Sequence, residues 1–330
     1  MTPFLKRDIA SYIQFPPKLF PSLLIFATRI VQVKSTLLTI RKGLKNLYFL
    51  VFINGVLLAS LLYFEIEADY DSSIFNALVE NVKADKSARL SQDTFLLRSM
   101  RMANALQQNR QKIFEGVEIN DIKSSLLHNS LDDLLTGRGA CGSASAILVR
   151  MLQIDGYETR LAQMKVNGTY GGHIIVEAKK GKGWIVMDPL YNCYFKKPGG
   201  QFASFEEVQK NWNYYKAFTP AGYPIDYKFE DVRYTNWEKL PVAGPIAKST
   251  LAFFMGKKNA DHVSLRPYLL QNFQIIFYIL QFIFIPVLLL TIHMFYKRSL
   301  SRKLQAKHSY ANKTEDAVIT YVNVPEYNRA

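Results

Sequence analysis

Two long apolar runs without a charged side chain constrain this sequence more than any other feature. The first run covers residues 47–64 and the second covers residues 273–296. A helix that crosses the hydrocarbon core of a bilayer needs about 20 predominantly apolar residues. Both runs are therefore predicted to be transmembrane helices, with a buried helix of a soluble domain as the alternative for the first run. Pro286 in the second run is compatible with this prediction, because neighbouring helices can satisfy the carbonyl group that it frees.

The chain of 330 residues has a formal net charge of +14, and most of the excess flanks the apolar runs. Residues 1–46 hold eight Lys or Arg and one acidic residue, while residues 297–330 hold seven and three. Flanks rich in Lys and Arg stay on the cytoplasmic side of a membrane. The sequence therefore predicts a two-pass protein of the inner or plasma membrane, with both basic termini cytoplasmic and residues 65–272 extracytoplasmic. The charge is thus interpreted as a topology signal that also attracts membrane lipids, and nucleic acid is not an expected partner.

The segment between the apolar runs has the pattern of an α+β domain, with helices first and an antiparallel sheet after them. Apolar residues at helical spacing follow two predicted helix starts, Asp71-Ser72-Ser73 and Ser91-Gln92-Asp93. Strand-like runs then cover residues 159–166, 173–178 and 184–188. The first two runs are separated by Asn167-Gly168, a strong hairpin signal between β-rich segments.

Three residues of this domain are candidates for nucleophilic chemistry. Cys141 begins a predicted helix after a glycine cluster, where backbone N–H groups and the helix dipole stabilise a thiolate. His173 begins one predicted strand and Asp188 ends the next, so an antiparallel pairing brings them together. A carboxylate orients a histidine, and the resulting imidazolium lowers the pKa of a nearby thiol. The alternatives are a small buried cysteine and a disulfide between Cys141 and Cys193.

Three sequence blocks hold these candidates in order. They read GACGSASAILVRMLQIDGYETR from residue 139, NGTYGGHIIVE from residue 167 and GWIVMDP from residue 183. Together the blocks resemble the transglutaminase-like superfamily, which has a papain-like core. The resemblance implies that Cys141 is a nucleophile that forms a thioester, that His173 transfers the proton and that Asp188 orients His173.

The resemblance extends more weakly over residues 90–215 and implies a cysteine-dependent hydrolase or acyltransferase. The superfamily includes protein cross-linkers, deamidases, peptidases, peptide N-glycanases and inactive members, so the expected substrate is a peptide or a cell-envelope polymer. The sequence has no D-x-D-x-D-G calcium loop and no C-x-x-C pair, and neither a metal site nor a cofactor is predicted. The alternative function is a catalytically inactive scaffold or binding module in an envelope or surface-polysaccharide assembly.

Further residues have weaker predicted roles. Tyr191 and Asn192 follow Asp188 closely and are expected to line the substrate site, while Arg160 and Trp184 are interpreted as structural. An aromatic-rich stretch is interpreted as a cover for the core, with a carbohydrate- or membrane-facing surface as the alternative. This stretch contains Tyr214, Tyr215, Phe218, Tyr223, Tyr227, Phe229 and Tyr234.

Overall fold

The computed structural model describes residues 43, 45–84, 91–115, 117, 127–239 and 243–322, with backbone alone from residue 311. The chain divides into two compact units. Residues Leu61–Leu280 form one unit, the domain, and the other unit combines the chain up to Ser60 with the chain from Gln281. Most of the predicted basic segment 1–46 and the end of the segment 297–330 lie outside the described residues.

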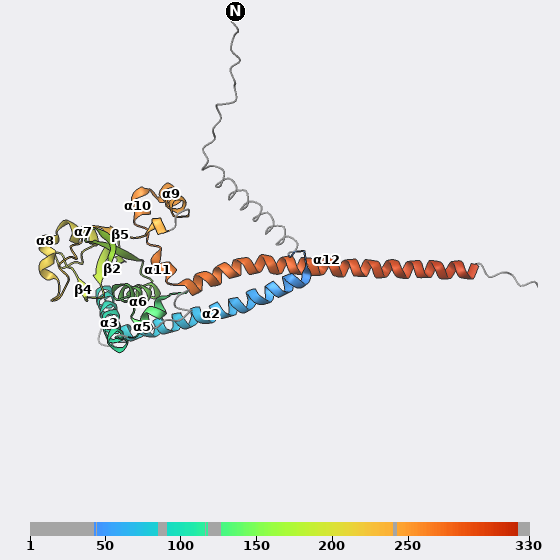
Figure 1. Cartoon of the computed structure of the whole chain (residues 1–330), viewed down its shortest axis with the longest axis horizontal. Coiled ribbons are helices and arrows are strands. Elements are labelled where there is room, and N and C mark those ends of the chain that lie inside the picture. The colour runs from blue at the N-terminus through green and yellow to red at the C-terminus, as the bar shows by residue number, and fades with distance from the viewer. Residues whose placement is uncertain are drawn as a thin grey trace, which may run out of the picture. The chain divides into compact units, whose positions relative to one another are not determined.

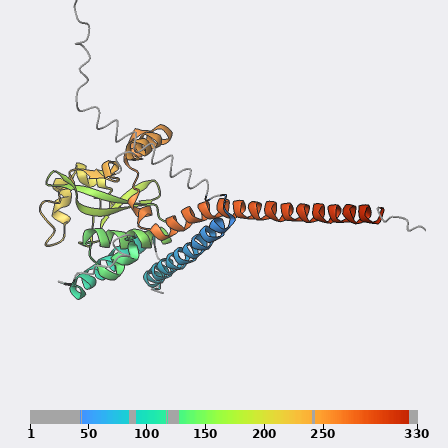
Figure 2. The same ribbon diagram turned by 45° about the vertical axis from the view of Figure 1, so that its right-hand side comes forward.

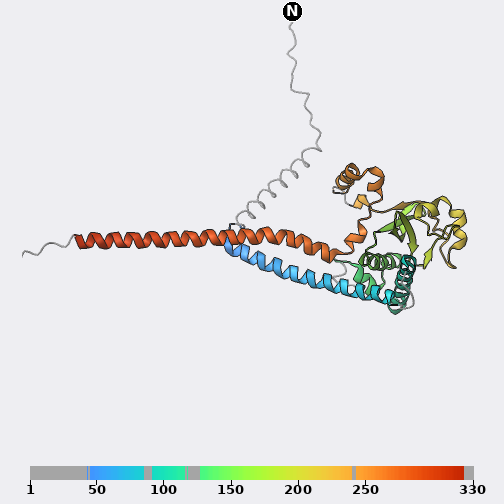
Figure 3. The same ribbon diagram turned by 180° about the vertical axis from the view of Figure 1, so that it is seen from behind.

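The two apolar runs lie in the two longest helices of the described chain, α2 (Leu47–Lys83) and α12 (Asn272–Val322), drawn in blue and red in Figure 3. Both helices are long and apolar enough to cross a membrane. Within the smaller unit the Asn54 side chain donates a hydrogen bond of 2.7 Å to the Thr291 hydroxyl. In a membrane, a polar link of this kind would hold two helices together where lipid removes the hydrophobic driving force.

The domain contains short helices and one antiparallel sheet in the strand order β4-β3-β2-β1-β5 (Figure 1). The strands are β1 (Thr159–Val166), β2 (Thr169–Lys180), β3 (Gly183–Asp188), β4 (Cys193–Tyr194) and β5 (Val232–Arg233). The helices before the sheet are α3 (Gln92–Ile113), α5 (Ser130–Thr136) and α6 (Cys141–Ile154). Between β4 and β5 lie α7 (Phe205–Lys210), α8 (Trp212–Tyr215) and η1 (Lys216–Phe218). After β5 come η2 (Trp237–Lys239), α9 (Ala243–Met255), α10 (Lys257–Asp261) and α11 (Arg266–Leu269). This α+β arrangement confirms the predicted fold class.

The sheet separates two hydrophobic cores because successive strand residues point to opposite faces. On one face Ile174 and Val176 of β2 pack with α3, α5, α6 and the end of α2. On the other face Ile175 and Val186 pack with Phe205 and the aromatic-rich stretch around α7 and α8. Figures 1 and 2 show the helices α3, α5 and α6 on one side of the sheet and α7 and α8 on the other.

Of the two helix starts predicted from the sequence, the structure has the one at Ser91 and lacks the one at Asp71. Ser91 caps α3 and accepts a hydrogen bond from the Thr94 N–H, as the sequence predicts. The predicted helix start at Asp71-Ser72-Ser73 is wrong, since these residues lie inside α2. The side chains of Asp71 and Ser72 bind Arg150 of α6 instead, with the Arg150 Nε 3.0 Å from the Asp71 Oδ2.

Candidate active site

His173 and Asp188 form the closest polar pair of the candidate site. The His173 Nε2 lies 2.6 Å from the Asp188 Oδ2, and both side chains are buried. Asp188 also accepts the backbone N–H of Leu190 at 3.1 Å, which fixes the second carboxylate oxygen. The other histidine nitrogen, Nδ1, is buried and has no hydrogen-bond partner among the described residues.

Cys141 is the first residue of α6. Burial alone raises the pKa of the Cys141 thiol, but the nearby His173 imidazole and the backbone N–H of Ile174 lower it, so that the pKa lies below that of an ordinary thiol. Burial lowers the pKa of His173, but its bond to Asp188 and the proximity of Cys141 raise the pKa to about 9. Together these shifts favour a thiolate beside an imidazolium at neutral pH.

The residue before the cysteine has an unusual backbone conformation. Ala140 has φ 43° and ψ −108°, and the Gly142 N–H donates a hydrogen bond of 2.8 Å to the Gly139 carbonyl. This is a turn of type II′, in which glycine usually occupies the position that Ala140 holds. A non-glycine residue in such a region costs about 1–3 kcal/mol and persists only where the surrounding structure imposes it. Among the described residues no acceptor takes the Cys141 N–H, which leaves it available for an oxyanion.

A buried hydrogen-bond chain holds this turn in place. The Gly139 N–H donates to the Ser143 hydroxyl at 2.8 Å, and that hydroxyl donates to the Asp133 carboxylate at 2.5 Å. The second oxygen of Asp133 lies 3.1 Å from the Nε2 of His128. A hydrogen bond to Asp133 raises the pKa of His128, although burial opposes the shift. The turn that carries Cys141 is therefore tied to α5 by charged and hydroxyl groups.

His173 does not begin its strand, because β2 already starts at Thr169. The register against β1 shifts between Met164 and Lys165, so that Gly171 and Gly172 form a bulge just before His173. Gly171 has φ 89°, and a Cβ atom on Gly172 would lie only 2.7 Å from the Cβ of Val166. Only glycine fits this bulge, and bulges redirect the side chain that follows.

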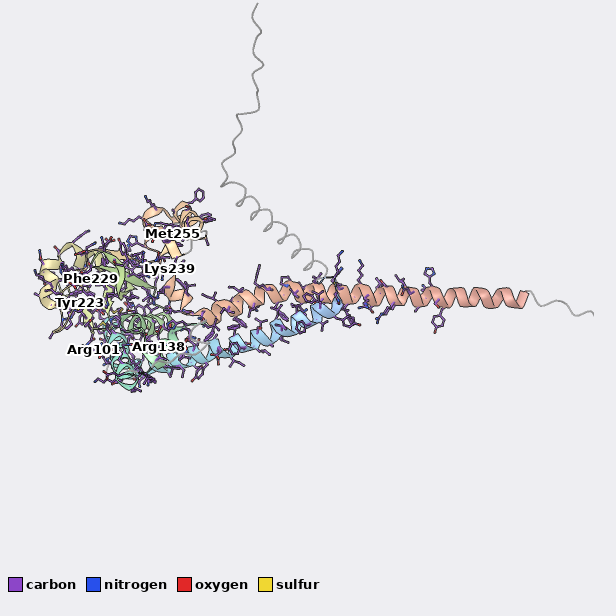
Figure 4. The ribbon with its side chains drawn as sticks, viewed as in Figure 1. Arg101, Arg138, Tyr223, Phe229, Lys239 and Met255 are labelled. Carbon is purple, nitrogen blue, oxygen red and sulfur yellow. The ribbon has the colours of Figure 1, made fainter. Side chains whose placement is uncertain are left out.

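Tyrosine side chains from a later part of the chain cover the His173–Asp188 pair. The Tyr227 ring stacks on the His173 ring with the centroids 4.2 Å apart and the planes at 20°. The Tyr223 hydroxyl donates a hydrogen bond of 3.0 Å to the Asp188 Oδ2. Figure 4 labels Tyr223 and Phe229 in this part of the domain, on the face opposite α6.

The two predicted substrate-lining residues have different surroundings. Tyr191 lies in the site, where its backbone N–H contacts the Asp188 Oδ1 at 3.4 Å and its ring lies 5.9 Å from that of His173. Asn192 is exposed, has φ 50°, and lines a groove of about 490 Å³ with Tyr214 and Phe218. No contact between Asn192 and the three candidate residues is found in the described chain.

Cys141 and Cys193 are both free. Cys193 is buried in the core on the face of the sheet opposite α6, and burial raises its pKa to about 12. The alternative of a disulfide between the two cysteines does not match this structure. Arg160 has the structural role expected of it: its guanidinium lies 3.6 Å from the centre of the Trp184 ring and pairs with the buried Glu177.

Comparison with known protein families agrees with this geometry. Residues 73–189 match the family model described as the transglutaminase-like superfamily. The chain contains a transglutaminase-like domain. Neither a search of curated proteins nor a search of solved structures gives a match.

The matched part of the transglutaminase-like domain ends directly after Asp188. Tyr223 and Tyr227, which cover His173 and Asp188, therefore lie beyond it. The sequence predicts that these tyrosines cover the core, but it does not predict that they contact His173 and Asp188. These contacts join residues far apart in the chain, so no local sequence pattern indicates them.

Proposed function

We propose that the transglutaminase-like domain is a cysteine-dependent hydrolase or acyltransferase that acts on amides of a peptide or cell-envelope polymer. The observation that carries the proposal is the buried His173–Asp188 pair, 2.6 Å apart, beside Cys141, whose pKa His173 lowers. This arrangement combines a thiol of lowered pKa with an oriented imidazolium. α2 and α12 would anchor the domain in an inner or plasma membrane with both chain termini cytoplasmic.

The reaction that this arrangement supports has two halves. In the first, the Cys141 thiolate attacks an amide carbonyl, the Cys141 N–H stabilises the oxyanion, and His173 gives its proton to the leaving amine. The C–N bond breaks and a thioester forms. In the second half, water or a second amine attacks the thioester while the neutral His173 takes its proton, and the free thiol returns. Asp188 stabilises the imidazolium and fixes its orientation throughout.

A scaffold without catalysis is the second candidate, and one observation favours it. His173 is completely buried beneath tyrosine side chains, as a residue of a polar core would be. Against this, Cys141 is partly exposed, whereas a thiol of a polar core would be buried. A scaffold would also have no need for the strained backbone at Ala140.

The rate of thiol alkylation separates the two candidates. We expect iodoacetamide to label Cys141 at neutral pH faster than an ordinary thiol, and His173→Ala to remove most of this advantage. Cys193 is the internal control, because its buried thiol should stay unlabelled in the folded protein. An acyl adduct on Cys141, detected by intact mass after exposure to envelope fractions, would identify the enzyme directly. Ordinary reactivity that His173→Ala leaves unchanged would contradict the catalytic function.

A further inference from the structure

The helix α9 has an apolar face whose large side chains are exposed. Ile246, Phe253 and Phe254 are exposed by 64%, 83% and 78%. Lys248 is the one charged residue among the 13 of this helix. A helix this apolar is ordinarily buried, and its exposure marks an interaction surface.

The inner face of the same helix is already occupied. The Lys248 Nζ lies 2.7 Å from the Asp261 Oδ1 and joins α9 to α10, where Ala260 is buried. Beyond α10 the Ser264 hydroxyl bonds both the N–H and the carbonyl of Leu161 and so attaches the chain to β1. The α9–α10 hairpin is therefore held in a defined orientation with its apolar face outward. Figure 4 labels Met255 on this hairpin.

The composition of the segment indicates a lipid surface. Residues 243–271 contain four basic residues and one acidic residue, and Lys257 and Lys258 directly follow the aromatic pair. Tyr268 and Leu269 of α11 are also exposed, and α12 with its apolar run begins at Asn272. Aromatic side chains beside lysines are typical of helices that lie in the headgroup region of a bilayer, and lysines add attraction to anionic lipids.

We propose that α9 lies in the outer surface of the membrane that α2 and α12 cross, with Phe253 and Phe254 among the acyl chains and Lys257 and Lys258 at anionic headgroups. This inference rests on the membrane anchoring in the proposed function. It adds a third contact between the domain and the bilayer, which limits the directions in which the candidate active site can face.

Quenching of a tryptophan by brominated lipids tests the contact. The full chain carrying Phe254→Trp is placed in nanodiscs of phosphatidylcholine, with and without phosphatidylglycerol, and the loss of emission on bromination of the acyl chains is measured against the wild type. Phe218→Trp is the matched control, since Phe218 is an exposed phenylalanine elsewhere on the domain. We expect a larger loss of emission for Phe254→Trp, which increases with phosphatidylglycerol and returns to the phosphatidylcholine level when Lys257 and Lys258 are replaced by serine.

Two outcomes would overturn the proposal. Quenching of Phe254→Trp no stronger than that of Phe218→Trp would place α9 away from lipid. Blue-shifted emission that is insensitive to bromination and disappears on dilution in detergent would assign the face to a second copy of the chain. Co-elution of the chain with the nanodiscs tests whether α2 and α12 anchor the chain in the bilayer, independently of α9. Alkylation of Cys141 tests the catalytic function, independently of both.

Discussion

At the scale of single residues, the candidate chemistry depends on a proton shared between two side chains. His173 lowers the pKa of Cys141, while Asp188 and then Cys141 raise the pKa of His173 to about 9. The pair therefore titrates as a unit, and its apparent pKa values belong to both residues. The reactive thiolate–imidazolium form exists between these two values.

A pair of alkylating reagents should reveal both limits of this pH range. We expect the rate with neutral iodoacetamide to rise with pH through a pKa below that of an ordinary thiol, because the imidazolium stabilises the thiolate. The rate with anionic iodoacetate should fall as pH rises through about 9, because His173 then loses the positive charge that attracts the reagent. Stopped alkylation followed by mass spectrometry measures both rates. Identical pH profiles for the two reagents would refute the ion pair.

Tyr223 is expected to position Asp188. Tyr223→Phe removes the hydrogen bond to the Asp188 Oδ2, so the carboxylate interacts more strongly with His173 and the alkaline limit should move to higher pH. The loss of an ordered partner should also slow acyl transfer by about ten-fold, as expected for a bond to a charged group. The shifted limit is a readout that simple loss of packing would not produce. Tyr214→Phe, at an exposed tyrosine, is the matched control and should leave both quantities unchanged.

At the scale of elements, the helix α2 carries a polar contact that belongs to the domain core. Asp71 and Arg150 are both buried, and Arg150 also donates to the Ser72 hydroxyl at 3.1 Å. Burial raises the pKa of Asp71, although Arg150 opposes the shift. The helix α6, which begins at Cys141, is therefore attached to α2 through buried charges.

Breaking this buried pair should strongly destabilise the domain. We expect Asp71→Asn to reduce the free energy of unfolding by about 3–5 kcal/mol, because it leaves the Arg150 charge buried and uncompensated. Denaturant unfolding in detergent, followed by tryptophan fluorescence, measures the change. Glu158→Gln breaks the exposed pair with Lys179 and should cost less than about 1 kcal/mol. A similar small effect for both variants would show that Arg150 finds other partners or water.

The same elements show how far the sequence could predict the structure. The strand at residues 159–166 was predicted with the bounds that β1 has, because a glycine turn ends it sharply. The start of a helix at Asp71 was predicted wrongly. A polar residue before an apolar run is typical of a helix cap, and the sequence does not show that Asp71 pairs with the buried Arg150 instead. The hairpin pattern placed His173 beside Asp188, and the resemblance to the transglutaminase-like superfamily added Cys141. Tyr223, in contrast, reaches Asp188 across 35 residues through a loop that has no periodicity.

At the scale of the whole molecule, the distribution of Lys and Arg predicts that both chain ends lie on one side of a membrane. In intact cells or spheroplasts, we expect tags at either terminus to resist added protease, while a cleavage site inserted at the exposed Gly199-Gly200 turn is cut. Permeabilised cells provide the control in which all three sites are cut. Cleavage of a terminal tag in intact cells would contradict the predicted topology, because that terminus would then lie outside the cell.

The sheet has a consequence for how the domain would lose its reactivity. Cys141 packs against the core on the helical face, whereas the tyrosines that hold His173 and Asp188 belong to the core on the opposite face. Cys141 and the tyrosine cover of His173 and Asp188 are thus held on opposite faces of one sheet. A small shift between these two faces would separate the thiol from His173 while the helices and strands stayed intact. We therefore expect the reactivity of Cys141 to report on the alignment of the two faces more sensitively than the content of secondary structure does.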